Sequence, residues 1–263
     1  MENKKTITSE KNEIIKNIIK LKKGRNRKKT AEFLIDGKRE IEIAIESNIK
    51  VKYVFLCLDL IKKDFKYTKE LEKYNPIYTN ISVFKKISYK ENPDGFLIIA
   101  EKQEKKLKNT KINKNENIVV LESIEKPGNL GAIIRTSYAA GVKNIILTNN
   151  KIDIYNPNII RASEGMIFKI NLIEESNEKT LLYLKDKNFK IYCAATSGSK
   201  IYTKSSYKGL SALVFGSEAN GLSEFWLKNS DQNIKIPMLK GIDSLNISVS
   251  VAVILFEVLR QKS

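Results

Sequence analysis

The sequence has no histidine, and this absence removes many kinds of enzyme chemistry. Ser-His-Asp and Cys-His catalysis both need an imidazole, and so do His-ligated zinc sites. The two cysteines, Cys57 and Cys193, are too few for a disulfide framework and suit a reducing compartment. We therefore expect no metal centre, and chemistry that depends on carboxylates, amides, hydroxyls, lysine, arginine or a cofactor.

Long apolar runs are also missing from the chain. No stretch reaches the roughly 18 apolar residues of a membrane span, and the N-terminal sequence MENKKTITSEKNEIIK lacks the apolar core of a signal peptide. Hydrophobic residues still make up 42% of the 263 residues, as in globular proteins. We expect a cytoplasmic protein with no membrane partner.

The chain has 47 basic and 30 acidic residues, so its net charge is +17. Such a charge attracts polyanions. Most of the basic residues are lysines, and part of their excess can instead reflect the coding bias of an AT-rich genome. For the basic tract at 22–29, a solvated loop and an RNA-contacting arm are both open. The candidate RNA-contacting residues are Arg25, Arg27, Lys28, Lys29, Arg39 and Arg161.

Short apolar strands alternate with helices in the first part of the chain, after an amphipathic helix within 10–21 that carries Ile14, Ile15, Ile18 and Ile19 on one face. The expected strands are 31–37, 51–58, 76–80 and 95–101, and the expected helices are 38–48, 59–74 and 82–90. Residues 1–100 are therefore predicted to form a basic arm and a small α/β domain.

Residues 101–116 are nearly free of apolar side chains and are predicted to be a solvated linker. In 117–263 the expected strands are 117–124, 144–149, 167–173, 190–197, 212–218 and 234–239, and the expected helices are 130–142, one within 157–166, 178–188 and 244–262. This alternation predicts a mostly parallel sheet. The last helix is apolar almost all round, so it needs burial on more than one side, which a dimer would supply.

The first glycine-rich segment is GSEANG at 216–221, which has the spacing of a phosphate-binding loop. Leu222-Ser223 follow it in place of Lys-Ser/Thr, which excludes a nucleoside triphosphatase. The chain has no G-x-G-x-x-G, so no Rossmann dinucleotide site is supported. A turn that holds an adenosine-like ligand through its backbone and a purely structural turn are both open.

Two further segments combine polar groups with the start of a helix. In KPGNLGAIIRT at 126–136, Asn129 is expected to cap a helix from which Arg135 offers a forked donor to a phosphate. In the segment 236–253, Ser244 and Asn246 precede the apolar last helix, where such polar groups could line a pocket. For the first segment, the alternative to a phosphate site is a capped helix with a surface arginine. For the second segment, the alternative to a pocket is that the polar residues only cap the helix.

Together, PGNLGAIIRT, VFGSEANGLS and IPMLKGIDSLNISVSVAVILFE resemble, in order and spacing, the three motifs of the SpoU (TrmH-like) family of RNA ribose 2′-O-methyltransferases, in the SPOUT superfamily. The resemblance covers 117–263 and includes NPNIIRASEGMIF at 156–168. Residues 31–100 look like the family's small N-terminal RNA-binding domain. The resemblance implies an α/β fold with a C-terminal trefoil knot, a rare exception among folds.

The resemblance further implies an S-adenosylmethionine-dependent enzyme that acts as an obligate homodimer, with ribosomal RNA as the expected substrate. A transfer-RNA methyltransferase, a resistance enzyme and a non-catalytic RNA-binding or ribosome assembly factor with the same fold remain open. The implied catalytic residues are Arg135, Asn129, Glu218 and Asn246. The implied cofactor-binding residues are Thr196, Gly216, Gly221, Ile236, Met238, Ser244 and Leu245.

Overall fold

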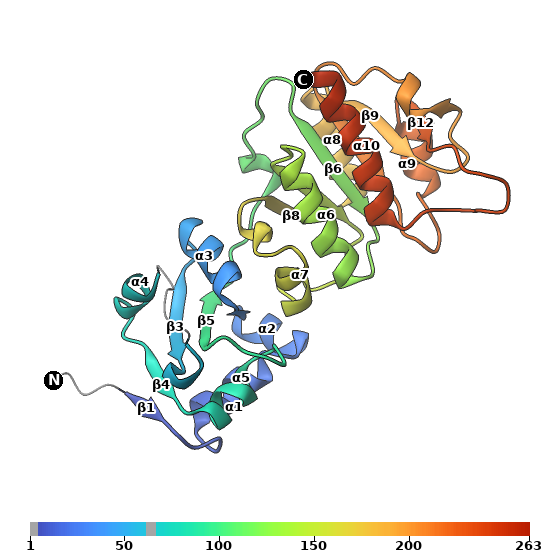
Figure 1. The fold of residues 1–263 in the computed structure, drawn as a ribbon. Helices are drawn as coiled ribbons and strands as arrows, with labels where there is room; N and C mark the ends of the chain where they lie inside the picture. The colour runs from blue at the N-terminus through green and yellow to red at the C-terminus, as the bar shows by residue number, and fades with distance from the viewer. Residues whose placement is uncertain (1–4, 62–66) are drawn as a thin grey trace. The chain divides into compact units, whose positions relative to one another are not determined.

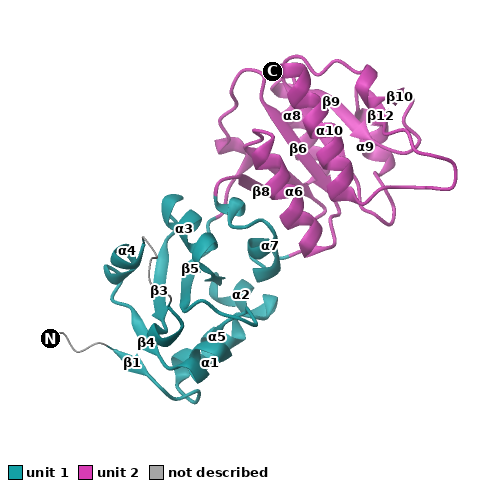
Figure 2. Cartoon of the chain, in the orientation of Figure 1, with its two compact units in different colours: residues 1–103, 153–168 teal, residues 104–152, 169–263 magenta. Residues whose placement is uncertain are grey.

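The computed structural model describes residues 5–61 and 67–263 (Figure 1). The chain forms two compact units: unit 1 comprises 1–103 and 153–168, and unit 2 comprises 104–152 and 169–263 (Figure 2). The expected parts were a domain at 1–100, a linker at 101–116 and a domain at 117–263. The two units differ from these in dividing the linker after residue 103 and in where 153–168 belongs. By its contacts this segment is part of unit 1.

Unit 1 is built on a mixed five-stranded sheet in the order β1-β4-β3-β5-β2. Its strands are β1 (Thr6–Ile7), β2 (Glu32–Asp36), β3 (Val51–Leu56), β4 (Ile77–Thr79) and β5 (Phe96–Glu101). β5 pairs antiparallel with both of its neighbours, whereas β4 pairs parallel with β1 and β3. The expected strands of this region are confirmed.

Helices pack around the sheet of unit 1, and most of them bury apolar side chains. They are α1 (Glu13–Lys20), α2 (Gly24–Thr30), α3 (Lys38–Glu46), α4 (Thr68–Glu72), α5 (Ile81–Ile87) and α7 (Pro157–Ala162). In α1, Ile15 and Ile18 are buried in the core, and Ile14 and Ile19 pack against it, as the amphipathic pattern predicted.

The single long helix expected at 59–74 is not present as such in the described residues. A 3-10 turn at Leu58–Leu60 and the short helix α4 lie in this region, and residues 62–66 lie outside the described part of the chain. The 3-10 turn directly follows Cys57, the buried residue after β3. The chain therefore leaves the sheet through a tight turn, which the alternation of apolar residues did not reveal.

Unit 2 is built on a seven-stranded sheet in the order β10-β12-β9-β11-β6-β7-β8. Its strands are β6 (Asn117–Glu122), β7 (Asn144–Thr148), β8 (Asn171–Glu175), β9 (Lys190–Ala194), β10 (Lys200–Ile201), β11 (Ser211–Phe215) and β12 (Gln232–Lys235). Every neighbouring pair is parallel. The predicted α/β class with a mostly parallel sheet is confirmed, and the central strands are buried as such sheets require.

Helices lie on both faces of this sheet: α6 (Pro127–Ala139), α8 (Asn177–Asp186), α9 (Glu224–Asn229) and α10 (Ile247–Lys262). α6 packs against α10, and the two helices run side by side in Figure 1. Alternate residues of β6, Ile118 and Val120, form a core with Leu184 of α8 and Trp226 of α9. This core and the α6–α10 pair leave the carboxyl ends of the strands accessible at one edge.

Two expectations for the chain around this sheet were wrong in detail. The segment 101–116 is not wholly solvated, because Leu107, in a 3-10 turn at Leu107–Asn109, is buried in the core of unit 2. The strand expected at 167–173 begins later, at Asn171, after a 3-10 turn at Met166–Phe168. Within the residues that the structure describes, none of the helices has the length and apolar character to cross a membrane.

Candidate functional site

A cavity of about 480 Å³ opens in unit 2 where β9, β11 and β12 end. In parallel α/β sheets ligands bind beyond the carboxyl ends of the strands. The loops that follow the three strands form its walls, and the first turns of α10 close it. All of the cofactor-binding residues expected from the sequence line this cavity: Thr196, Gly216, Gly221, Ile236, Met238, Ser244 and Leu245.

The loop after β11 folds tightly back on itself at the cavity. Gly216 is so close to Gly221 that a Cβ atom on Gly216 would lie 2.0 Å from the carbonyl carbon of Gly221. The loop is closed by an isolated bridge between Ser217 and Gly221, and Gly221 has a φ of +66°. Gly216 is therefore required for this loop shape, which presents backbone groups to the cavity.

A polar cluster at the rim of the cavity joins three segments that are far apart in the sequence. Oε1 of Glu218 accepts hydrogen bonds from Nδ2 of Asn129 and from Nδ2 of Asn246, each at 2.7 Å. Nδ2 of Asn246 also lies 3.3 Å from Oδ1 of Asn129. The fold thus brings together three of the four residues that the motifs marked as catalytic.

Glu218 carries its negative charge in this cluster. Nζ of Lys126 lies 2.6 Å from Oε2 of Glu218, and this hydrogen bond is the main reason that the pKa of Glu218 is lowered from its usual value. Lys126 directly precedes Pro127, and the sequence motifs indicated no role for it. No local sequence pattern could have revealed this ion pair, because Glu218 lies in the loop after β11, far from Lys126 in the sequence.

Asn246 also has a structural role. Its Oδ1 accepts a hydrogen bond of 2.9 Å from the backbone N–H of Ser248, so Asn246 is the N-cap of α10. Asn246 therefore both caps α10 and contributes to the rim of the cavity, two roles that the sequence left as alternatives.

Asn129 is not a helix cap, and the expected helix start was wrong. α6 begins at Pro127, with Lys126 at the N-cap position, so Asn129 lies within the first turn. Proline favours this first helical position because its φ is already helical and its missing N–H is not needed there. The side chain of Asn129 is consequently turned toward Glu218.

Arg135 lies in the same helix, further from its N-terminus than the sequence predicted. Its side chain is exposed and does not line the cavity of its own chain. The fourth motif residue is therefore not brought to the cavity, whereas Asn129 and Asn246 meet Glu218.

The basic residues predicted to contact RNA all belong to unit 1, and they differ in exposure. The tract at 22–29 was expected to be a loop or an arm, but most of it forms α2, on which Arg25, Lys28 and Lys29 are exposed. Arg39 is also exposed and pairs with Glu164 at 2.7 Å. Arg161 is exposed on α7.

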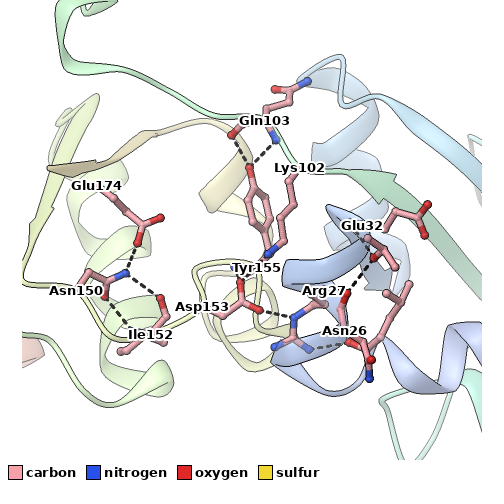
Figure 3. A network of polar contacts seen from close by, with 12 residues as sticks. Asn26, Arg27, Glu32, Lys102, Gln103, Asn150, Ile152, Asp153, Tyr155 and Glu174 are labelled. Atoms are coloured by element: carbon pink, nitrogen blue, oxygen red, sulfur yellow. Dashed lines mark hydrogen bonds and ion pairs between the residues drawn. The ribbon is translucent and has the colours of Figure 1, made fainter.

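Arg27 was wrongly predicted to contact RNA, because its side chain is buried and is directed toward Asp153 (Figure 3). Its Nε lies 2.6 Å from Oδ2 of Asp153, and its Nη1 donates to the carbonyl oxygens of Leu21 and Lys22. Nζ of Lys102 binds the other oxygen of Asp153 at 3.1 Å. Arg27 therefore fastens α2 to the segment 153–168 within unit 1.

Replacing Asp153 with alanine is expected to destabilise unit 1 by about 3 kcal/mol, because the buried guanidinium of Arg27 would lose its charge partner. Burial raises the pKa of Asp153, but Arg27 and Lys102 outweigh it and the pKa is lowered. The stabilisation should thus be complete above about pH 4 and be lost as the pH falls through the folded-state pKa. Urea unfolding at several pH values measures both effects. The control is Lys29→Ala, on the exposed side of α2. Equal stability of the two variants would contradict the role of Asp153 as the charge partner of Arg27.

Two family profiles match the chain, and together they account for most of it. The SpoU rRNA Methylase family matches residues 116–256, which is more than half of the chain and contains the cavity and the polar cluster. The chain belongs to the SpoU rRNA methylase family. The MRM3-like substrate binding domain matches residues 12–98, within unit 1.

One curated 23S rRNA methyltransferase is similar over nearly the whole length of this chain, and another over about half of it. The 23S rRNA (guanosine(2553)-2′-O)-methyltransferase RlmP of Bacillus subtilis is 27% identical over 253 residues, which cover 96% of this chain and 98% of the relative. The 23S rRNA (guanosine-2′-O-)-methyltransferase RlmB of Haemophilus ducreyi is 36% identical over 152 residues, 56% of this chain and 61% of that protein.

Solved structures of RNA methyltransferases share the fold. An RNA 2′-O ribose methyltransferase superposes with a TM-score of 0.84 at 30% identity, covering 98% of this chain and 99% of that one. An AdoMet-bound rRNA methyltransferase from Sinorhizobium meliloti gives a TM-score of 0.89 at 26% identity, with 97% of each chain covered. The likeness thus includes unit 1 as well as the methylase part.

Proposed function

We propose that this protein transfers a methyl group from S-adenosylmethionine to a ribose 2′-oxygen in ribosomal RNA. The observation that carries the proposal is the placement of the motif residues: seven line one cavity, and three more meet at its rim. The full-length similarity to RlmP of Bacillus subtilis, named as a 23S rRNA 2′-O-methyltransferase, favours ribosomal RNA.

The cavity fits S-adenosylmethionine in size and chemistry. Its volume lies within the roughly 300–1,000 Å³ typical of small-molecule sites. Backbone groups of the loop at Gly216, where no Cβ intrudes, and the apolar side chains of Ile236, Met238 and Leu245 suit an adenosine moiety. When bound, the cofactor would supply a methyl group on a positively charged sulfur that is a good leaving group.

The protein's own contribution is to hold the nucleophilic oxygen in line with the methyl group. The guanidinium of Arg135 would donate to the ribose 2′-oxygen and an adjacent phosphate, and would stabilise the negative charge that develops on the oxygen. Because a guanidinium seldom loses its proton, Arg135 orients the hydroxyl rather than acting as a base. The hydroxyl proton would pass to solvent water as the O–CH3 bond forms and the S–CH3 bond breaks. Asn129, Glu218 and Asn246 would shape the rim at which the ribose enters.

The homodimer expected from the sequence belongs to this proposal. Arg135 does not line the cavity of its own chain, so a second copy would supply it. Val249 and Phe256 on α10 and Tyr138 on α6 are 47%, 49% and 43% exposed, although they are large and apolar. These side chains would gain burial in a dimer. The C-terminal trefoil knot stays a prediction of the resemblance.

Unit 1 offers a basic surface for the RNA. Exposed basic side chains on α1, α2, α5 and the turn before α2 are Lys16, Lys20, Lys23, Arg25, Lys28, Lys29, Lys85 and Lys86. α1 contacts α5, and Nζ of Lys22 donates to the carbonyl oxygen of Lys86, so these elements form one surface. We propose that this surface, with Arg39 and Arg161, binds the RNA backbone, and that the protein acts in the cytoplasm.

RNA affinity is expected to fall steeply with salt, with a slope near −0.7 per phosphate contacted in single-stranded RNA. The double variant Lys28→Glu, Lys29→Glu should weaken binding and flatten the slope by about one unit or more, because both side chains are exposed on α2. Fluorescence anisotropy at several salt concentrations measures this, with Lys179→Glu on α8 as the control. A salt-independent affinity would mean that the basic excess reflects coding bias.

The deciding experiment is transfer of a labelled methyl group to RNA from a strain that lacks this protein. A methylated 2′-oxygen cannot attack the neighbouring phosphate, so the modified position resists alkaline cleavage and can be mapped. Incorporation into ribosomal RNA is expected, whereas incorporation into transfer RNA would favour the second substrate class. If calorimetry detects no binding of S-adenosylmethionine at millimolar concentration, the protein is a non-catalytic RNA-binding or assembly factor.

A further inference from the structure

Glu122 is a buried carboxylate behind the cavity that the motif residues do not include. It is the last residue of β6 and is 3% exposed. A buried carboxylate is costly unless its oxygens accept hydrogen bonds. Here both oxygens accept hydrogen bonds, from Ser223 at the start of α9 and from Asn177 at the start of α8.

The first partner is Ser223, directly after the cavity-lining residues Gly221 and Leu222. The backbone N–H of Ser223 donates to Oε2 of Glu122 at 2.8 Å, and its hydroxyl donates to Oε1 at 2.7 Å. Ser223 stands at the N-cap position of α9, yet its side chain makes no capping hydrogen bond. Its hydroxyl is committed to Glu122 where a serine at this position would normally cap the helix.

The second partner is Asn177, whose Nδ2 donates to Oε1 of Glu122 at 2.8 Å. The Oδ1 atom of Asn177 accepts a hydrogen bond of 2.9 Å from Nε1 of Trp226. An indole N–H can only donate, so Asn177 must turn its oxygen toward Trp226 and its NH₂ group toward Glu122. The orientation of the amide is therefore fixed by the buried tryptophan.

These contacts require that both oxygens of Glu122 accept. Oε2 faces a backbone N–H, and Oε1 faces an amide NH₂ group whose orientation is fixed. A glutamine at this position would place an NH₂ group against one of these two donors. Only a carboxylate satisfies both, and it thereby holds the end of the cavity loop at the carboxyl end of β6.

We infer that Glu122 is a positioning residue for the cofactor loop 216–223, acting through Ser223 and without touching the cofactor. Glu218 fastens the middle of this loop to Asn129 and Asn246. Glu122 fastens its end to the sheet and, through Asn177, to Trp226. The inference rests on the proposed function, because it concerns the affinity of the same cavity for S-adenosylmethionine.

Glu122→Gln is expected to weaken the binding of S-adenosylmethionine by about tenfold or more, because one donor would be left facing another donor. Calorimetry measures the affinity. Trp226 is the only tryptophan of the sequence and is fully buried, so its emission maximum shows whether the core around it is intact. An unchanged emission maximum with weaker binding separates loop positioning from unfolding.

Glu116→Gln is the matched control. Glu116 is buried just before the opposite end of the same strand, where its carboxylate accepts from the side chain of Asn144 and from the backbone of Asn113. This substitution should lower the melting temperature and leave the affinity for S-adenosylmethionine unchanged. If it weakens binding as much as Glu122→Gln does, the effect is one of global stability and the inference is overturned.

A milder variant covers the case in which Glu122→Gln does not fold. Ser223→Ala removes the hydroxyl but keeps the backbone N–H, so binding should weaken about threefold to tenfold. If Ser223→Ala, or a folded Glu122→Gln, binds like the unaltered protein, Glu122 does not position the loop and the proposed function stands. If the unaltered protein itself does not bind S-adenosylmethionine, the proposed function fails.

Discussion

Arg135→Ala is expected to lower the turnover number of RNA methylation by about 100-fold or more, with little change in the affinity for S-adenosylmethionine. The guanidinium would be lost from the place where negative charge develops on the attacking oxygen, and one such donor is worth about 100-fold to 1,000-fold in rate. The cavity itself would be unchanged, because Arg135 does not line it. Single-turnover methylation at saturating RNA and cofactor measures the effect.

Arg135→Lys should recover little of this activity, since an ammonium cannot replace the planar forked donor. The control is Lys143→Ala, which removes an exposed positive charge from the loop before β7, at the other end of the sheet. Lys143→Ala should leave turnover unchanged. Near-normal methylation by Arg135→Ala would remove this residue from the mechanism.

The second large effect concerns the cofactor loop. Gly216→Ala is expected to weaken S-adenosylmethionine binding by about 100-fold or more, because the new Cβ atom would lie 2.0 Å from the carbonyl carbon of Gly221. No Cβ approaches backbone so closely, so the loop must open and lose the shape that lines the cavity. Calorimetry with S-adenosylmethionine measures the loss, and circular dichroism checks that the sheet is retained.

Gly128→Ala is the control for this substitution. Gly128 lies in the first turn of α6, where a Cβ atom would meet no other atom within 4 Å, and its φ is not in the left-handed region. Alanine there should keep cofactor binding and slightly stabilise the helix. Tight binding by Gly216→Ala would mean that the loop is plastic and that its tight reversal is not part of the site.

Mixing the two inactive variants tests the proposed dimer. If Arg135 of one copy serves the cavity of the other, a mixed dimer of Arg135→Ala and Gly216→Ala contains one intact site. Methylation should then reappear on mixing. If each chain completes its own site, the mixture stays inactive, and the dimer would have no part in the chemistry.

The sequence was most informative where function depends on residue type. The missing histidines excluded whole classes of catalysis, and the three motifs marked residues that the fold brings to one cavity and its rim. A parallel sheet explains this success, because the loops after its strands must meet at one edge. The glycine at 216 was marked by spacing, and the close approach to Gly221 gives the physical reason.

The sequence was least informative where burial decides. Arg27 and Arg25 stand two residues apart in one basic tract, yet only Arg25 is exposed, because α2 turns Arg27 toward Asp153. A helix places such neighbours on different faces, and the tract was not recognised as a helix. Lys126 and Glu122 were overlooked because their partners, Glu218 and Ser223, are distant in the chain.

The amino-acid order by itself determined the alternation of strands and helices, the family motifs and the residue types available for chemistry. Only the tertiary structure decided which charged groups are buried, where α6 begins, and which carboxylate holds the end of the cofactor loop. The reason is physical: periodicity and local preference are properties of neighbouring residues, whereas burial and hydrogen-bond partners depend on segments that meet only when the sheet forms.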